Sequence, residues 1–214
     1  APDTNYIQDL SHKFALRLYG SRKFTGYKLG QFGNKRVIYY PNSNINVGVG
    51  ASYKFLNINI GFPAPFINND KDKYGKTRFL DLQSYIYMRK LTIDLYAQFY
   101  NGYYLANNEV LTTTPPNGYL QRPDIKTKTI GTTVEYVFNH KKFSYRSIYL
   151  QNELQKKSAG SFLAGGGVHY VNMRADSSVI PTNIADKDLF NGVHFNQFDF
   201  INLTANFGYA HNFV

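Results

Sequence analysis

INVGVGASY, residues 45–53, alternates apolar and polar side chains along its whole length. A repeat of two places one set on each face of an extended chain, so the stretch is expected to be a β-strand with one apolar and one polar face. The faces are Ile45, Val47, Val49, Ala51 and Tyr53 against Asn46, Gly48, Gly50, Ser52 and Lys54. Residues 56–62 repeat the pattern, and the two runs meet at Lys54-Phe55. They form either a tight hairpin or one long, bent strand.

The same alternation predicts strands over most of the chain. Residues 80–88 and 91–99 flank Arg89-Lys90 and are expected to form an antiparallel hairpin. Residues 143–154 also count as a strand, but their faces do not sort cleanly, which indicates a bulge or a misplaced boundary. Further strands are expected at 14–19, 129–138, 161–171 and 201–210. The total is roughly nine strands in an all-β, antiparallel fold.

Strand length separates the two architectures that alternation allows. In a soluble sandwich the apolar face forms the core, whereas in a membrane barrel it contacts lipid and the polar face lines the lumen. Several runs reach about 9–11 residues, the length that a tilted strand needs to cross the hydrocarbon layer, while soluble strands average about 5–6. Charges on the polar faces suit a wet lumen, although a sandwich would carry them on its outer surface. The lumen-facing polar residues are predicted to be Arg17, Lys54, Asp81, Asp94 and Glu135.

Composition limits the class without choosing a function. The 214 residues fit one domain, residues 1–214, whose net charge of +10 is spread along the chain without the Lys/Arg run of a nucleic-acid-binding arm. There is no Cys, which excludes disulfides and thiolate chemistry. No apolar stretch is long enough for a transmembrane helix. A mean hydropathy of −0.39 is compatible with a barrel, because a spanning strand shows lipid only at every second residue.

Backbone hydrogen bonding requires a sheet in lipid to close on itself, with an even number of strands in a bacterial barrel. The odd count and the turn-like end at 211–214 predict that closing strands are missing and that the complete transmembrane barrel has roughly 10–12 strands. The connections at 89–90 and 139–141 are short, and those at 21–41, 63–77 and 101–124 are long. Short and long connections should alternate along the chain, but the connection 174–197 is long where this alternation predicts a short one. Either a strand is missed there or this segment enters the lumen.

Several motifs, in a fixed order, resemble one known family. They are DTNYI (3–7), LRLY (16–19), YPN (40–42), NVGVG (46–50), FINND (66–70), KYGKT (73–77) and QKKSAGSF (155–162). Over nearly the whole chain they resemble an uncharacterised family of Bacteroidota outer-membrane proteins catalogued as a domain of unknown function (DUF4421). The resemblance implies an outer-membrane β-barrel, and members tend to extend further at the C-terminus. It implies no activity and no catalytic residues. Because no basic and apolar leader precedes Ala1, we expect that a signal peptide has been removed.

Two loop motifs resemble ligand sites only weakly. Gly75-Lys76-Thr77 ends like a phosphate-binding loop, but Asp70 stands where that loop needs glycine. Residues 69–75 carry two aspartates and a glycine at the spacing of a calcium loop, yet lysines flank the aspartates and would repel the ion. Solvated loops explain both motifs better.

Histidine and glycine patterns give no catalytic constellation. The histidines His12, His140, His169, His194 and His211 lack metal-ligand spacing. Ser161 and His169 share a strand face but stand eight residues apart, far beyond hydrogen-bond reach at about 3.3 Å per residue. Gly165-Gly166-Gly167 either leaves space for a ligand or, as we favour, marks a strand where backbones or large side chains approach closely.

The predicted function is therefore structural. We expect an accessory outer-membrane barrel that binds other outer-membrane or periplasmic proteins within a larger envelope complex, with a lumen filled by side chains and held by ion pairs among Arg17, Asp81, Asp94, Glu135 and Arg146. The alternatives are a passive channel for small solutes and a lipid-modifying barrel enzyme. Expected partners are membrane lipids, including lipopolysaccharide. No cofactor, no metal and no nucleic acid are expected, and the protein is not expected to be an enzyme.

Overall fold

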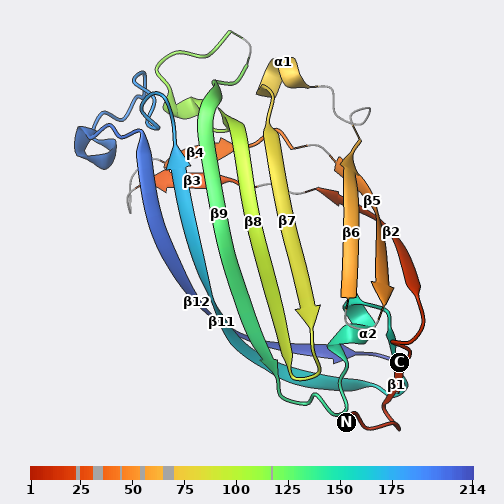
Figure 1. Ribbon diagram of the computed structural model, residues 1–214. Helices are drawn as coiled ribbons and strands as arrows, with labels where there is room; N and C mark the ends of the chain where they lie inside the picture. The colour runs from red at the N-terminus through yellow and green to blue at the C-terminus, as the bar shows by residue number, and fades with distance from the viewer. Residues whose placement is uncertain (23–24, 31–35, 44, 54–55, 65–69, 117) are drawn as a thin grey trace.

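The computed structural model describes residues 1–22, 25–30, 36–43, 45–53, 56–64, 70–116 and 118–214. Within them, eight strands of eight or more residues form a curved wall (Figure 1). These wall strands are β2 (Ala15–Arg22), β5 (Ile45–Tyr53), β6 (Leu56–Pro63), β7 (Arg78–Tyr87), β8 (Leu91–Leu105), β9 (Gln121–Val137), β11 (Ala159–Arg174) and β12 (Gln197–Asn212). Short elements complete the fold: β1 (Ile7–Asp9), β3 (Tyr27–Gly30), β4 (Arg36–Tyr40), β10 (Glu153–Gln155), α1 (Lys71–Tyr74), α2 (Tyr145–Tyr149) and the single turns Asn108–Val110 and Leu189–Gly192.

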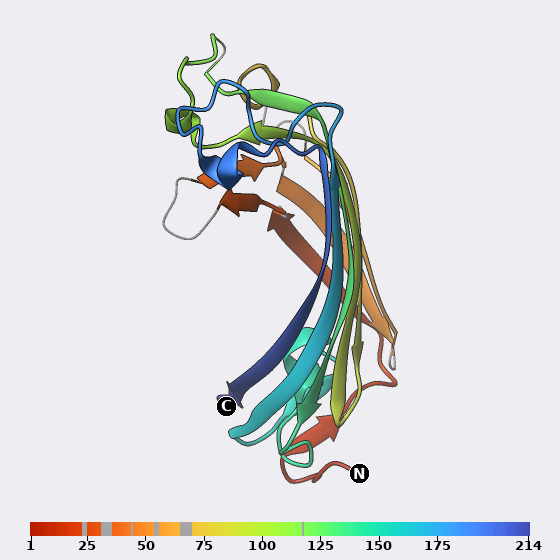
Figure 2. The same ribbon diagram turned by 90° about the vertical axis from the view of Figure 1, so that its left-hand side faces the viewer.

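The wall is all antiparallel. Its order is β2-β5-β6 in one sheet and β7-β8-β9-β11-β12 in the other. β6 lies beside β7, but no ladder of hydrogen bonds joins the described residues of these two strands. The sheets curl in the same sense into a half-barrel, and β2 and β12 form its two edges (Figures 1 and 2).

Two predicted hairpins are confirmed. Tyr53 pairs with Leu56 and the ladder continues to Asn46 and Pro63, so residues 45–62 form a hairpin rather than one bent strand. Lys54-Phe55, at its turn, lies outside the described residues. Strands β7 and β8 pair across Arg89-Lys90, where the Met88 amide donates to the Leu91 carbonyl (2.8 Å).

The strand predicted at residues 143–154 is wrong. The Ser144 hydroxyl accepts a hydrogen bond from the Ser147 amide (3.0 Å) and begins helix α2, and β10 pairs with β1 instead of joining the wall. The connection that follows β9 is therefore long, not short. The described wall strands number eight, so the odd count that predicted missing strands is also wrong. Without the false strand, the connection 175–196 no longer conflicts with the expected alternation, because it lies at the same end of the wall as the other long connections (Figure 1).

The two faces of the wall differ in polarity. The convex face carries the apolar set of each alternating strand, and Leu18 (87%), Phe207 (85%) and Leu203 (77%) are among its most exposed side chains. The concave face carries the polar set. A sheet that buried its apolar face in a soluble core would show the reverse exposure.

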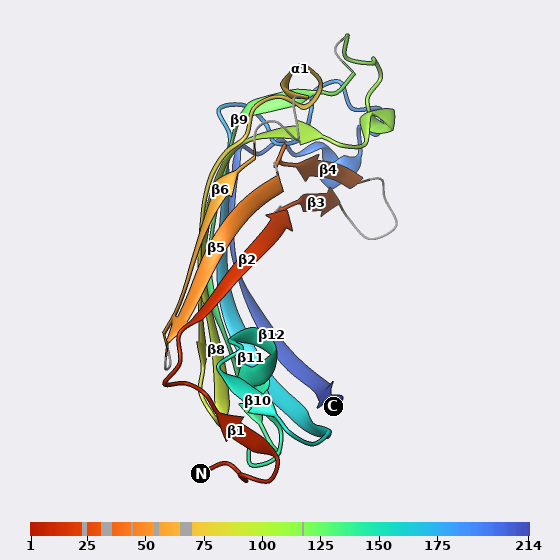
Figure 3. The same ribbon diagram turned by 90° about the vertical axis from the view of Figure 1, so that its right-hand side faces the viewer.

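Packed cores occupy the two ends of the concave side rather than its middle. At the upper end, the β3–β4 hairpin and the segment 175–190 pack against the inner face of β8, β9 and β11 (Figures 2 and 3). The largest fully buried side chains there are Tyr39, Tyr100, Tyr103, Leu105, Ile125, Met173, Ile180 and Leu189. At the lower end, Val137, Phe143 and Ala159 form a smaller cluster. The middle of the concave side is left to polar groups.

None of the helices in the described ranges has the length and apolar character needed to cross a membrane.

Candidate functional site

A cleft of about 1360 Å³, lined by charged and amide side chains together with apolar ones, occupies the middle of the concave side. Strands β2 and β5 to β9 form its wall, and α2 contributes to its lower end. Residues from both faces of β7 line it, Leu80 and Leu82 as well as Asp81 and Gln83. The cleft therefore extends around the edge of β7 that lacks a hydrogen-bonded neighbour.

The structure brings four of the predicted lumen residues into this cleft. Arg17 on β2, Asp81 on β7, Asp94 on β8 and Glu135 on β9 all line it. Lys54 lies outside the described residues. Within the described part of the chain, no ion pair joins any two of these four side chains, so the direct ion pairs expected between them are not formed.

Arg17 is held by neutral acceptors. Its guanidinium donates to the side-chain oxygens of Asn57 (2.6 Å) and Asn59 (2.9 Å) on β6, and to the backbone carbonyl of Tyr149 at the end of α2. Gly50 makes room for this arrangement, because a Cβ there would stand 2.3 Å from the Asn59 Oδ1 and 3.3 Å from the guanidinium. Arg17 thus joins the first wall strand to the helix inside the half-barrel.

Asp81 accepts hydrogen bonds from the next strand. The Gln98 amide nitrogen donates to its Oδ2 (3.1 Å), and so does the Tyr100 hydroxyl (3.3 Å). Gln98 in turn accepts from Thr25 Oγ1 (3.1 Å), near the β3–β4 hairpin. This chain of contacts leads from the cleft to its upper end.

Asp94 and Glu135 are diagonal neighbours on adjacent strands. The register places Thr133 opposite Asp94 and Thr92 opposite Glu135, a diagonal spacing of about 7–8 Å. Asp94 Oδ1 is buried and has no hydrogen-bond partner among the described residues. The two carboxylates give this part of the cleft a negative charge, in contrast to Arg17 on β2.

Tyrosine rings fill the cleft beside these carboxylates. Tyr87 stacks on Tyr149 of α2 (ring centroids 5.3 Å apart) and contacts Tyr145 (5.6 Å), while Tyr85 lies parallel to Tyr87 (6.0 Å). Each ring is a large, flat surface with a polar tip, so the cluster can fill a wet interior without burying an unpaired polar group. Tyr145 and Tyr149 were not expected here, because residues 143–154 were predicted to form a wall strand, whereas alternation does place Tyr85 and Tyr87 on the polar face.

A buried polar network lies below α2 and closes the lower end of the cleft; we call it the floor network, and its residues are Arg89, Ser144, Arg146, Glu153, Gln155 and Asn212. The Glu153 side chain is fully buried and binds two arginines, Arg146 of α2 (3.1 Å) and Arg89 of the β7–β8 turn; it also accepts a hydrogen bond from Ser144. Arg146 was predicted to be a lumen charge, and it does form an ion pair. Its partner, Glu153, was missed.

Gln155 and Asn212 extend the network to the far edge of the wall. The Asn212 amide donates to Gln155 Oε1 (3.1 Å) and to the Ser144 carbonyl (3.0 Å). Gln155 also donates to the backbone carbonyls of Lys142 (2.7 Å) and Lys157 (2.8 Å). The end of β12 is thereby attached to the floor.

An ion pair fixes the upper end. Arg122 binds both carboxylate oxygens of Asp124 (2.8 Å each) and donates to the Ser178 carbonyl (2.9 Å) of the segment that follows β11. The guanidinium holds the pKa of Asp124 at about 2. Burial raises the pKa of Tyr39 to about 12, and its hydroxyl donates to the Val179 carbonyl (2.5 Å).

The histidine and serine considered as a catalytic pair in the sequence, His169 and Ser161, do not contact each other. His169 faces inward and stacks on Tyr96 (5.3 Å), whose hydroxyl bonds to its Nδ1, whereas Ser161 bonds to the Asn139 amide (2.9 Å). Gly167 fits the close-approach interpretation, because a Cβ there would stand 2.8 Å from the His169 ring and from the Thr132 carbonyl. The described residues contain no group of three or more side chains able to hold a metal ion.

These features define a class of protein: a curled, antiparallel half-barrel with an apolar convex face and, between packed elements at its two ends, a cleft that carries charged and amide side chains. The chain belongs to the family described as "Domain of unknown function (DUF4421)", which it matches over residues 1–214. No curated protein and no solved structure matches it.

Proposed function

We propose that this protein is the wall of a transmembrane β-barrel in the outer membrane of a Bacteroidota bacterium, and that its role is structural, as a subunit or partner of a larger envelope complex. The observation that carries the membrane assignment is the exposed convex face. Its apolar residues lie opposite one another across five strands. One such line is Leu82, Ala97, Ile130, Tyr170 and Ile201, and another is Ile86, Ile93, Val134, Gly166 and Ala205.

The height of this apolar band supports the proposal. It runs from Ile130 on β9 to Phe138, the first residue after that strand, which is about 27 Å along an extended chain. A strand tilt of about 40° reduces this to about 20 Å along the membrane normal, near the band of about 25 Å found on outer-membrane barrels. Aromatic side chains border the band below, where Tyr136, Phe138, Phe162 and Tyr209 are exposed.

The edges of β2 and β12 require partners in lipid, because unpaired backbone groups there are costly. β2 and β12 stand on opposite sides of the half-barrel (Figure 1) and run antiparallel, since eight alternating strands lead from one to the other. Only an even number of further strands can join them. Adding two or four gives roughly 10–12 strands, the size proposed for the closed barrel.

A structural role fits the contents of the half-barrel better than a transport role. The cleft lies between the upper core and the floor network, and both are fixed by buried hydrogen bonds. Purification in a mild detergent should co-isolate partner proteins in fixed stoichiometry. A protein that is recovered alone, but still inserts into vesicles, would exclude the accessory role and keep the membrane assignment.

A passive channel is the second candidate, favoured by the size of the cleft and by the charged side chains that line it. It predicts ion conductance across a planar bilayer, and a change in ion selectivity when Arg17→Gln or Glu135→Gln alters the charge of the cleft. A bilayer that contains the inserted protein and passes no current would exclude the channel.

A further inference from the structure

Four cations lie together on the convex face, directly above the apolar band. Arg78 on β7, Lys126 and Lys128 on β9 and Arg174 on β11 are all exposed. The register places Lys126 opposite Arg174 on one side and opposite Asn101 of β8 on the other, and Arg78 lies opposite Asn101 on the next strand, β7. We call these four side chains the basic row.

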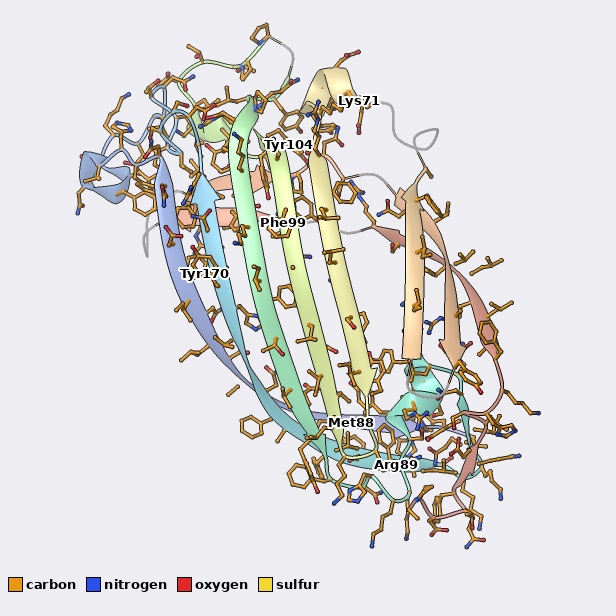
Figure 4. All side chains as sticks on the ribbon, in the orientation of Figure 1. Lys71, Met88, Arg89, Phe99, Tyr104 and Tyr170 are labelled. Atoms are coloured by element: carbon orange, nitrogen blue, oxygen red, sulfur yellow. The ribbon has the colours of Figure 1, made fainter. Side chains whose placement is uncertain are left out.

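The basic row is continuous with the apolar surface. On β9 the outward positions read Lys126, Lys128, Ile130, Thr132 and Val134, so the charge changes to apolar within one step of the alternation. Phe99 lies opposite Lys128, and Tyr170 lies one outward position below Asn172, which also pairs with Lys128. Figure 4, which views the convex face, labels Phe99 and Tyr170 in its upper half.

Protein groups leave these cations available. Within the described ranges, none of the four forms an ion pair. Asp199 is an acid on this face: it lies opposite Asn172, its charge interacts with that of Arg174, and it accepts hydrogen bonds from Tyr170, Asn172 (2.8 Å) and Gln197 (3.0 Å). One acid beside four cations leaves the basic row with a net positive charge.

We infer that the basic row binds the headgroup phosphates of membrane lipids packed against the convex face. The inference rests on the proposed membrane-spanning function and assigns the residues that bind the lipid. Neighbouring strands are about 4.8 Å apart, so Lys126 and Arg174 can contact one phosphate together, and Lys128 stands about 7 Å from Lys126 along the strand. Arginine offers two parallel donors to a phosphate, and lysine adds a point charge.

The position of the row selects a lipid phosphate over a free one. A dissolved phosphate has no reason to favour cations that border an apolar surface. A lipid presents its phosphate at the top of its acyl chains, and the row lies at the top of the band that those chains would cover. Each cation near an anionic lipid surface changes association by roughly fivefold.

The test uses the purified protein in vesicles of phosphatidylcholine that contain spin-labelled phosphatidylglycerol or spin-labelled phosphatidylcholine. The wild-type protein is expected to prefer the anionic lipid at its perimeter. The variant Lys126→Gln/Lys128→Gln should lower that preference by about tenfold or more, while Lys126→Arg/Lys128→Arg should retain it. The matched control is Lys28→Gln/Lys187→Gln, which removes the same charge from β3 and the segment 175–196, away from the convex face.

The outcomes separate this inference from the proposed function. Failure of the wild-type protein to insert into pure phosphatidylcholine vesicles would overturn the membrane assignment itself. Insertion without anionic preference, or equal losses of preference in the test and control variants, would overturn only the lipid-binding role of the basic row. Competition by millimolar inorganic phosphate that abolishes the preference would identify a site for the free ion and overturn the lipid assignment.

Discussion

Glu153 is a single carboxylate on which three elements depend. Its buried side chain binds Arg89 of the β7–β8 turn and Arg146 of α2. Glu153→Gln should destabilise the fold by about 3 kcal/mol, because it leaves two partly buried cations without their counter-charge. Chemical unfolding in detergent measures this loss. The same change at exposed Glu109 should have almost no effect, and equal effects at the two positions would contradict the role of Glu153.

Asp124 makes the stability of the fold depend on pH. It lies at the upper end of β9, above the apolar band, and its pKa of about 2 in the folded state is below the value of about 3.9 for an unfolded chain. Its contribution is therefore present above about pH 4 and is lost as the pH falls from about 4 to about 2. It amounts to at most about 2.6 kcal/mol.

Asp124→Asn should remove that part of the pH dependence. Thermal unfolding measured between about pH 2 and pH 5 is expected to give a flatter profile for the variant than for the wild-type protein. Asp188→Asn in the exposed segment that follows β11 is the control. A wild-type slope that persists in Asp124→Asn would show that other carboxyl groups cause it.

At the scale of single residues, the sequence predicted which side chains face the cleft but not their partners. Alternation alone assigned Arg17, Asp81, Asp94 and Glu135 to the polar faces. It could not show that Arg17 binds two asparagines and a carbonyl of α2, because these partners depend on register and on a helix that the pattern did not reveal.

At the scale of elements, α2 begins where Ser144 caps its first turn. The hydroxyl accepts the Ser147 amide hydrogen bond (3.0 Å) and donates to Glu153. Ser144→Ala should cost about 1–2 kcal/mol, the loss of a helix cap together with a bond to a buried carboxylate. Ser144→Thr should restore most of it. Unfolding curves of the two variants are the measurement, and equal stability of Ser144→Ala and the wild-type protein would refute the capping role.

Long strands were predictable and short inward elements were not. Strands β9, β11 and β12 alternate over many residues, so chance agreement is improbable and all three were found, although β9 begins at Gln121 and β12 at Gln197, before their predicted starts. Helix α2 has five residues and β10 has three, too few for a period of 3.6 or 2 to be recognised. Mixed faces at 143–154 marked the failure, and the correct interpretation was an element that leaves the wall.

At the scale of the whole molecule, the medium that contacts the convex face decides the cost of a charge there. Leu203 on β12 is 77% exposed and lies near the middle of the apolar band, in line with Leu95, Thr132 and Val168. In water, Leu203→Arg would change the free energy of unfolding by about 0.5 kcal/mol or less. In a bilayer, an arginine at this depth costs about 2–4 kcal/mol.

Leu203→Arg is therefore expected to destabilise the protein in vesicles by about 2–4 kcal/mol, as measured by urea unfolding with tryptic protection as the readout. Leu154→Arg is the matched control: Leu154 is 51% exposed, but it belongs to β10, outside the wall, so its variant should unfold like the wild-type protein. A penalty at Leu203 alone would mean that hydrocarbon contacts the convex face. If both variants unfold at the wild-type urea concentration, water or another protein covers that face, and the lipid-facing assignment of every strand in the wall is wrong.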